Sequence, residues 1–168
     1  MTYTNTNEII KDDDVISRWI ITPIHIKTMN DGSVIVDPTQ TFQFQTKANP
    51  SLSESVNCHR LLDNDNQKIH DMGKLSNDNK RQDNPNSNKE YIGFIEANVG
   101  VIRKYKESFI SFEVKHSPNS DNHGHCDLLM VVDGNNEVNN NIKSCKTLAK
   151  IGLRKCFGEI IRANVIQD

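Results

Sequence analysis

Residues 108–132 read SFISFEVKHSPNSDNHGHCDLLMVV, and this stretch predicts two neighbouring strands joined by a polar turn. Ser108–His116 alternates apolar and polar side chains, as a strand with one buried face does. His125–Val132 is apolar without a break from Leu128 onward, so we expect it to lie inside the sheet. The segment between them, His116–Asp127, holds three of the six histidines of the chain. Polar, titratable groups at a strand–loop–strand junction are suited to forming a site.

Alternating patterns elsewhere predict further strands. Val15–Thr22 is mostly apolar on both faces, so we expect an interior strand. Arg18 on one of those faces then needs an acidic partner or a route to solvent. The other predicted strands are Ser33–Val36, Thr41–Thr46, a strand within Ser53–Leu62 that runs into a short helix, and Tyr91–Asn98, which a short helix or turn at Val99–Lys106 follows.

The clearest helical pattern lies near the C-terminal end. Apolar or small residues recur at spacings of three and four from about Asn140 to Ile161, which predicts an amphipathic helix docked on the sheet. The stripe consists of Ile142, Cys145, Ala149, Gly152, Cys156 and Ile160, widened by Leu148 and Leu153. Together the patterns predict an α+β fold, a mixed or antiparallel sheet of about five or six strands packed by this C-terminal helix.

A chain of 168 residues fits one domain of ordinary size. We expect a flexible N-terminal arm over residues 1–14, which is polar and ends in three aspartates, and a single α+β domain over residues 15–168. Gln67–Leu75 predicts a helical turn. The following segment, Ser76–Lys89, has nothing to bury, so we expect a mobile loop at residues 76–89.

Charge and composition exclude some classes of function. A net charge of −2 makes no bulk electrostatic case for nucleic acid or an anionic membrane. The C-terminal helix carries a local basic ridge that consists of Lys143, Lys146, Lys150 and Arg154. Such a ridge is most simply a solvated face, so nucleic acid is a minor alternative among the binding partners, supported only by this ridge. The polar N-terminus lacks a secretory signal, and no apolar run is long enough to span a membrane. The four cysteines form no disulfide framework, so we expect free thiols in the cytoplasm.

The histidine segment admits three interpretations. In an extended chain His123, His125 and Asp127 share one face, and His116 ends the preceding strand. These groups can form an acid–base pair, or a metal site with Cys58 or His59. The spacing matches no zinc pattern, so no metal is assigned. The alternative is an ordered turn in which Asp121, Asn122 and the histidines hydrogen-bond the backbone.

The segment Ser53-Glu-Ser-Val-Asn-Cys-His-Arg60 is a second polar cluster. Arg60, with Ser55 and Asn57, can hold a phosphate or carboxylate. Cys58 and His59 are sequence neighbours that point to opposite faces of a strand, so they are poorly placed to act as a nucleophile and its base. The alternative is a strand-to-helix entry with serine caps and a surface arginine.

The order of these segments also carries a resemblance. The chain resembles small uncharacterised prokaryotic proteins in the order of four segments. These are Val15–Ile21 with Arg18, Ser53–Arg60, Tyr91–Arg103, and His116–Leu128 with Asp121-Asn122 and His125. In those proteins a Ser-Val segment is followed by a strand and then by an Asp-Asn-x-x-His element near the C-terminus. The resemblance implies a standalone compact domain and no particular activity.

We therefore expect a cytoplasmic domain that binds a small anionic or nucleotide-like ligand, with no cofactor identified. The predicted ligand-binding residues are Arg18, Ser55, Asn57, Arg60, Asp121, Asn122 and His123. If the protein is an enzyme, His125 is the acid–base group and Asp127 its orienter. The alternative is a non-enzymatic interaction module whose protein partner docks on the sheet or the helix. A pocket that gathers both polar clusters would favour the ligand; a flat surface with the clusters far apart would favour the interaction module.

Overall fold

The computed structural model of the chain describes residues 7–46, 52–133 and 142–164. The strands are β1 (Val15–Thr22), β2 (Ile26–Thr28), β3 (Val34–Val36), β4 (Gln45–Thr46), β5 (Leu52–Cys58), β6 (Glu90–Asn98), β7 (Lys106–Glu107), β8 (Ile110–His116), β9 (His125–Val132) and β10 (Ile161–Arg162). The helices are α1 (Pro38–Thr41), the 3₁₀ turn η1 (Arg60–Leu62), α2 (Asn66–Asp83), α3 (Val99–Lys104) and α4 (Ile142–Cys156).

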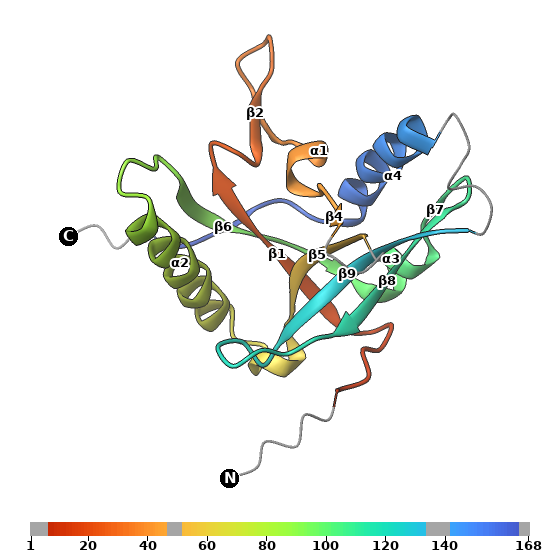
Figure 1. Cartoon of the computed structure of the whole chain (residues 1–168), viewed down its shortest axis with the longest axis horizontal. Helices are drawn as coiled ribbons and strands as arrows, with labels where there is room; N and C mark the ends of the chain where they lie inside the picture. Colours follow the sequence, from red (N-terminus) through yellow and green to blue (C-terminus); the bar gives the residue numbers. More distant parts are fainter. Residues whose placement is uncertain (1–6, 47–51, 134–141, 165–168) are drawn as a thin grey trace.

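The main sheet is antiparallel throughout (Figure 1). Its strands lie in the order β10-β6-β1-β5-β9-β8-β7, and β4 also pairs with β5. The predicted α+β class with a C-terminal helix is confirmed. β1 and β9 are both flanked by neighbours on two sides, as their apolar patterns predicted.

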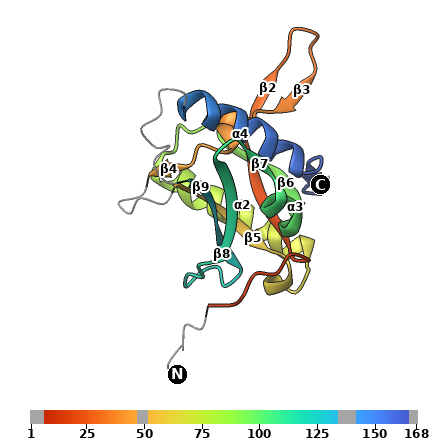
Figure 2. The same cartoon turned by 90° about the vertical axis from the view of Figure 1, so that its right-hand side faces the viewer.

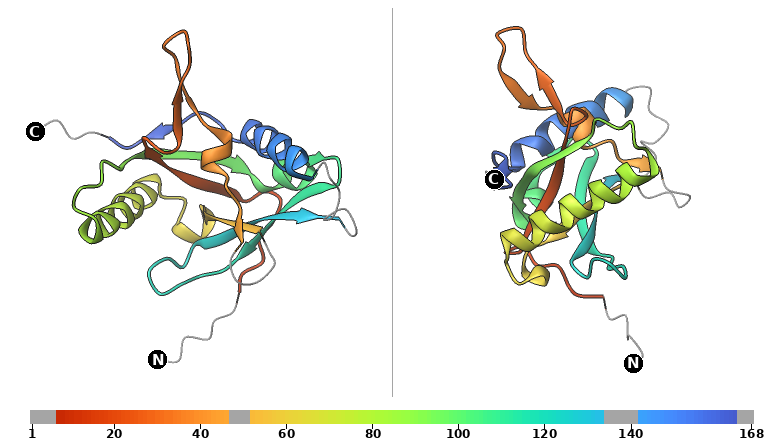
Figure 3. Two further views of the ribbon diagram at one scale, coloured as in Figure 1. Left: turned by 45° about the horizontal axis from the view of Figure 1, so that its top comes forward. Right: turned by 90° about the vertical axis from the view of Figure 1, so that its left-hand side faces the viewer.

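The sheet has an apolar core on each face. On one face, here called the α4 face, Ala149 and Leu153 of α4 pack onto side chains such as Ile16, Val56 and Leu128. On the other, the α2 face, Ile69 packs with Phe94, Leu62 and Trp19. Figure 3 shows α2 and α4 on opposite sides of the sheet. Because α2 lies mainly on β6, the β5–β9–β8 half of the α2 face is not covered by that helix (Figure 1).

The strands β1 and β5 are joined along a short seam. They pair only at Ile16 with Cys58 and at Ser17 with Asn57, whereas β1 and β6 pair along their whole lengths. Beyond Ser17 the two strands separate. The sheet therefore consists of two well-paired halves, β10-β6-β1 and β5-β9-β8-β7, that meet at this β1–β5 seam.

A glycine at position 93 allows the last strand to join the sheet. Gly93 has a φ of 153° and lies at the irregularity between Ile20 and Ile21 of β1. A Cβ there would clash with the backbone carbonyl oxygen of Ile161. Only glycine gives β10 this close approach to β6.

Helix α2 corrects the expected mobile loop at residues 76–89. It continues through Ser76 to Asp83, so only residues 84–89 form the connection to β6. Its buried stripe includes His70, Gly73 and Asn77 beside Ile69. The missing Cβ of Gly73 makes room for the ring of Tyr91, and the Asn77 amide donates to the Lys89 carbonyl at 3.1 Å. An apolar pattern cannot detect a stripe made of these residues.

Two other expectations were wrong in part. Most of the strand expected at Thr41–Thr46 is absent: Asp37 caps a helical turn that ends at Thr41, and Phe44 has a φ of 51°. The N-terminal arm is held from Glu8 onward, because the Glu8 amide donates to His116, Ile10 is buried and Asp14 is bonded to Arg60. Met1 to Thr6 of that arm lie outside the described residues.

Helix α4 is shorter than predicted, from Ile142 to Cys156, and Asn140 lies outside the described residues. Leu153 is fully buried as expected, but Leu148 is exposed and does not belong to the stripe. The four cysteines are free thiols. No helix in the described parts of the chain has the length and apolar character needed to cross a membrane.

The strands β2 and β3 form a separate hairpin that projects from the body of the molecule beyond α4 (Figure 2). Ile26 to Thr28 pair with Val34 to Val36, and a turn that includes Asp31 and Gly32 connects them. The Asp31 carboxylate accepts from the Ser33 amide at 2.9 Å and Gly32 has a φ of 82°, which together close the turn.

Candidate functional site

Polar side chains lie in cross-strand register on the α2 face, beside the core that α2 forms with β6. Ser17 of β1 is opposite Asn57 of β5, and Asn57 is opposite His125 of β9. Two residues along each strand on the same side of the sheet, Ser55 is opposite Asp127. Side chains of directly opposed residues point to the same side of a sheet. These residues, with Trp19, His59 and Lys115, form what is called here the polar face.

The two predicted polar clusters meet at this end of the sheet. The Asn122 amide donates to the Asn57 side-chain oxygen at 2.7 Å, and both residues are buried. The Asn122 side-chain oxygen accepts from the Gly124 amide at 3.1 Å. Gly124 in turn packs against Leu62 of η1. The segment after β5 and the loop before β9 are therefore in direct contact.

The loop itself is an ordered turn. The side-chain oxygen of Asn119 accepts from the amides of Asp121 and Asn122 at 3.0 and 2.8 Å. His116 accepts from the Glu8 amide through Nδ1 and donates through Nε2 to the His123 carbonyl. The side chains of Asp121 and His123 are exposed at the tip. This geometry agrees with the structural interpretation of these loop residues rather than with a set of ligand contacts.

His125 is held by Ser117 and not by Asp127. Its Nδ1 lies 2.8 Å from the Ser117 carbonyl oxygen, which can only accept. The Ser117 hydroxyl also lies 2.9 Å from Nδ1. The carbonyl contact favours the tautomer in which Nδ1 carries the proton and Nε2 has the lone pair. Asp127 lies two residues further along the same face and has no hydrogen bond to His125, so Ser117 is the residue that orients the ring in this structure. His125 remains half-exposed, with Nε2 as its basic atom.

Arg18 does not belong to the polar face. It points to the α4 face, as its neighbours Ile16 and Ile20 do, and forms an ion pair with Glu54 at 3.0 Å. The guanidinium also donates to the carbonyl oxygens of Thr41 and Ser55, at 3.2 and 2.9 Å. Burial lowers the pKa of Arg18, while the Glu54 carboxylate raises it. Arg18 thus bridges the gap where β1 separates from β5.

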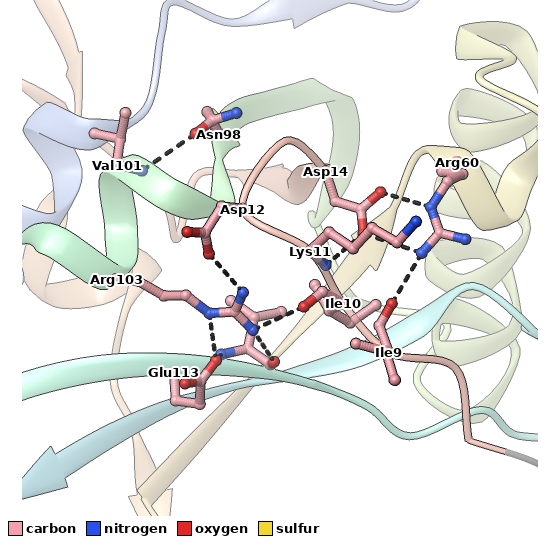
Figure 4. A network of polar contacts seen from close by, with 11 residues as sticks. Ile9, Ile10, Lys11, Asp12, Asp14, Arg60, Asn98, Val101, Arg103 and Glu113 are labelled. Atoms are coloured by element: carbon pink, nitrogen blue, oxygen red, sulfur yellow. Dashed lines mark hydrogen bonds and ion pairs between the residues drawn. The ribbon is translucent and has the colours of Figure 1, made fainter.

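Arg60 is also engaged within the protein (Figure 4). Its guanidinium donates to both carboxylate oxygens of Asp14, at 2.7 and 3.0 Å, and to the Ile9 carbonyl oxygen. This bidentate pair lowers the pKa of Asp14 and raises that of Arg60. Arg60 fixes the N-terminal segment rather than presenting its charge to a ligand.

A second arginine fastens the same segment (Figure 4). Arg103 of α3 pairs with Asp12 at 2.8 Å and with Glu113 at 2.6 Å, and it donates to the Ile10 carbonyl oxygen. The segment before β1 is therefore held at two points, by η1 through Arg60 and by α3 through Arg103. We call residues 9–14, held in this way, the N-terminal strap.

Cys58 and His59 lie on opposite faces, as alternation predicted. Cys58 is buried in the α4-face core, and the ring of His59 packs edge-on against Phe94 on the α2 face. The Nε2 atom of His59 is 3.7 Å from Glu96. Burial lowers the pKa of His59, so the ring is neutral at pH 7. Neutral His59 and buried Cys58 form no nucleophile–base pair.

The polar face contains most of the buried polar side-chain atoms that lack a hydrogen-bond partner among the described residues. They are Ser17 Oγ, Trp19 Nε1, His59 Nε2 and Asp127 Oδ1. Another such atom, Thr41 Oγ1, lies elsewhere. Buried polar atoms in native proteins are nearly always paired with protein, water or a ligand. Their gathering on one face marks this place as the candidate site.

Sequence reasoning missed Ser17, Trp19 and Lys115 as members of this face and considered His59 only as a possible metal ligand. Lys115 is exposed and directly opposite Asp127 in the register of β8 and β9. Alternation along Ser108–His116 placed it on the face away from the core, so the signal was available. Trp19 is an apolar strand residue in the sequence, and only the structure shows that its indole N–H lacks an acceptor.

Within the part of the chain that the structure describes, no three His, Cys, Asp or Glu side chains are close enough together to hold a metal ion. No protein-family model, curated protein or solved structure matches the chain. The geometry of the polar face is thus the basis for the functional argument.

Proposed function

We propose that the polar face binds a small polar ligand of the nucleotide-like or anionic kind. The observation that carries this proposal is the set of four unpartnered buried atoms on one sheet face. Trp19 Nε1 can only donate, Asp127 Oδ1 accepts, and the Ser17 hydroxyl can do either. A ligand edge that donates and accepts side by side, as the edge of a nucleobase does, is the natural complement.

The charges on this face are mixed: Lys115 is opposite Asp127, and Glu96 of β6 is opposite Ser17. Arg18 and Arg60 are already paired with carboxylates, so neither is an anchor. Lys115 is exposed on the same face and is the cation best placed for the ligand. His125 Nε2 is the basic atom next to it along the sheet. If the bound ligand is turned over, His125 is the group that accepts its proton.

The proposal is tested by thermal unfolding with the four ribonucleoside monophosphates and, separately, inorganic phosphate. A ligand that binds only the folded state raises the melting temperature, by an amount that grows with the logarithm of its concentration relative to Kd. We expect at least one nucleotide to raise it for the native chain. Trp19→Phe, which keeps an aromatic ring but lacks the indole N–H, and Asp127→Asn should each reduce the shift.

Asp78→Asn is the matched control, because Asp78 is exposed on α2 and away from the polar face. It should respond to nucleotide as the native chain does. A nucleotide shift that survives both Trp19→Phe and Asp127→Asn would place the ligand elsewhere. A shift with phosphate alone would limit recognition to the anion and remove the argument from a nucleobase edge.

A further inference from the structure

The surface between the β2–β3 hairpin and α4 exposes apolar side chains from both elements. Val34 and Ile35 of β3 are 59% and 42% exposed, and Leu148 and Ile151 of α4 are 52% and 39% exposed. A groove of about 370 Å³ runs between the two elements, with Val34, Ile35 and Ile151 among its lining residues. Isolated exposed apolar side chains are ordinary, but several along one groove mark an interaction surface.

The helix beside this groove is basic. Helix α4 carries Lys143, Lys146, Lys150, Arg154 and Lys155 and contains no Asp or Glu. Arg154 and Lys155 line the groove, and Glu159 is the one carboxylate among its lining residues. Arg154 donates to the carbonyl oxygens of Phe157 and Gly158, at 3.0 and 3.3 Å, which fixes its guanidinium at the end of α4. An apolar floor therefore has cations along its helical side.

We propose that this groove docks an acidic, amphipathic segment of a partner protein. The apolar side chains of the segment would cover Val34, Ile35 and Ile151, and its carboxylates would face Arg154 and Lys155. The hairpin and α4 lie on the other side of the sheet from the polar face, so this site is independent of the proposed ligand.

The chemistry of the groove favours a protein segment over nucleic acid. Its lining residues include no aromatic side chain on which a base can stack, and its floor is apolar. A second copy of this chain is a poorer complement. Among the described residues the other long helix, α2, mixes acidic residues such as Asp78 with basic ones such as Lys80, and the aspartates of the N-terminal strap at positions 12 and 14 are already paired with arginine.

The test is a selection from a display library of random peptides about four helical turns long. The native chain is the bait, and Ile151→Asp protein is used first to remove peptides that bind elsewhere. We expect the enriched peptides to place Asp or Glu around apolar side chains. A synthetic consensus peptide should lose about tenfold in affinity or more against Ile151→Asp and against Lys155→Glu, and should bind more weakly at high salt.

Leu75→Asp and Lys80→Glu make the same changes at exposed positions of α2 and should leave peptide affinity unchanged. Circular dichroism verifies that all four variants are folded. Enriched peptides without acidic residues, or no enrichment over the Ile151→Asp protein, would overturn the proposal. Binding of a labelled single-stranded DNA through Lys155 without any need for Ile151 would also overturn it, as would self-association that Ile151→Asp abolishes.

Discussion

The hydroxyl of Ser17 is fully buried between β6 and β5, yet it has no hydrogen-bond partner among the described residues. Leaving a buried polar atom unpaired costs about 1–3 kcal/mol of stability. Such a cost is tolerated where function needs the atom. The stability of a Ser17 variant therefore distinguishes two possibilities for the polar face. Either a ligand supplies the missing hydrogen bond of the hydroxyl, or an ordered water already does so.

We expect Ser17→Ala to stabilise the unliganded protein by about 1 kcal/mol, because the variant removes an unpaired buried hydroxyl and leaves the methylene packing. Urea unfolding of the two proteins measures the difference. Asn57→Ala next to it is the contrasting variant and should destabilise, since Asn57 accepts from Asn122 at 2.7 Å. A loss of stability in Ser17→Ala would mean that a buried water already pairs the hydroxyl.

The sequence predicts the environment of a single residue where its chain neighbours determine that environment. It does not do so where contacts with residues far away in the sequence determine it. The face of Arg18 follows from alternation with Ile16 and Ile20, so its place in the α4-face core was available from the sequence. The ion pair between Arg60 and Asp14 could not be predicted from the sequence, because 46 positions separate the two residues and the sequence contains many other carboxylates.

At the scale of elements, alternation located β1, β6, β8 and β9 to within about two residues, because a period of two is a local property. The expected strand at Thr41–Thr46 failed because Phe42 and Phe44 both point into the core from non-strand backbone. The end of α2 was missed because its buried side chains include glycine, histidine and asparagine. Apolar pattern alone cannot predict packing that depends on the partner surface.

Helix α4 offers a matched pair of leucines for testing its packing. Leu153 is fully buried, and Leu148 is 52% exposed. We expect Leu153→Ala to lower the free energy of unfolding by roughly 2–4 kcal/mol, because it removes core contacts and leaves a cavity. Leu148→Ala should change it by less than about 0.5 kcal/mol. Equal losses in urea unfolding would mean that α4 is not docked by the face described.

At the scale of the whole molecule, three histidines link stability to pH: His25, which is half-buried, and His59 and His70, which are buried. Burial is the main cause that lowers the pKa of His25 from 6.5 to about 4. Burial also lowers the pKa of His59 and of His70. Below pH 6.5 the unfolded chain binds protons that the folded chain does not, so each of these histidines favours unfolding as the pH falls.

We therefore expect the free energy of unfolding to be highest above pH 6.5 and to decline between pH 6.5 and 4. His25→Gln should make this decline shallower, because glutamine does not titrate. Below that window the paired carboxylate of Asp14, whose pKa is also lowered, adds a further loss. Urea midpoints across this range measure the slope. A native chain whose midpoint stays flat from pH 6.5 to 4 would contradict the burial of these rings.

The β1–β5 seam has a consequence for how the chain must be made. Each half of the sheet consists of strands from distant parts of the sequence. The half that contains β1 needs β6 and β10, and the half that contains β5 needs β9 and β8, all of which are synthesised later. As the chain leaves the ribosome, β1 and β5 emerge first and find each other at only two paired positions. Neither half can close before most of the protein has been synthesised. The nascent chain therefore carries open strand edges for most of its translation, the period in which it most depends on being shielded from other chains.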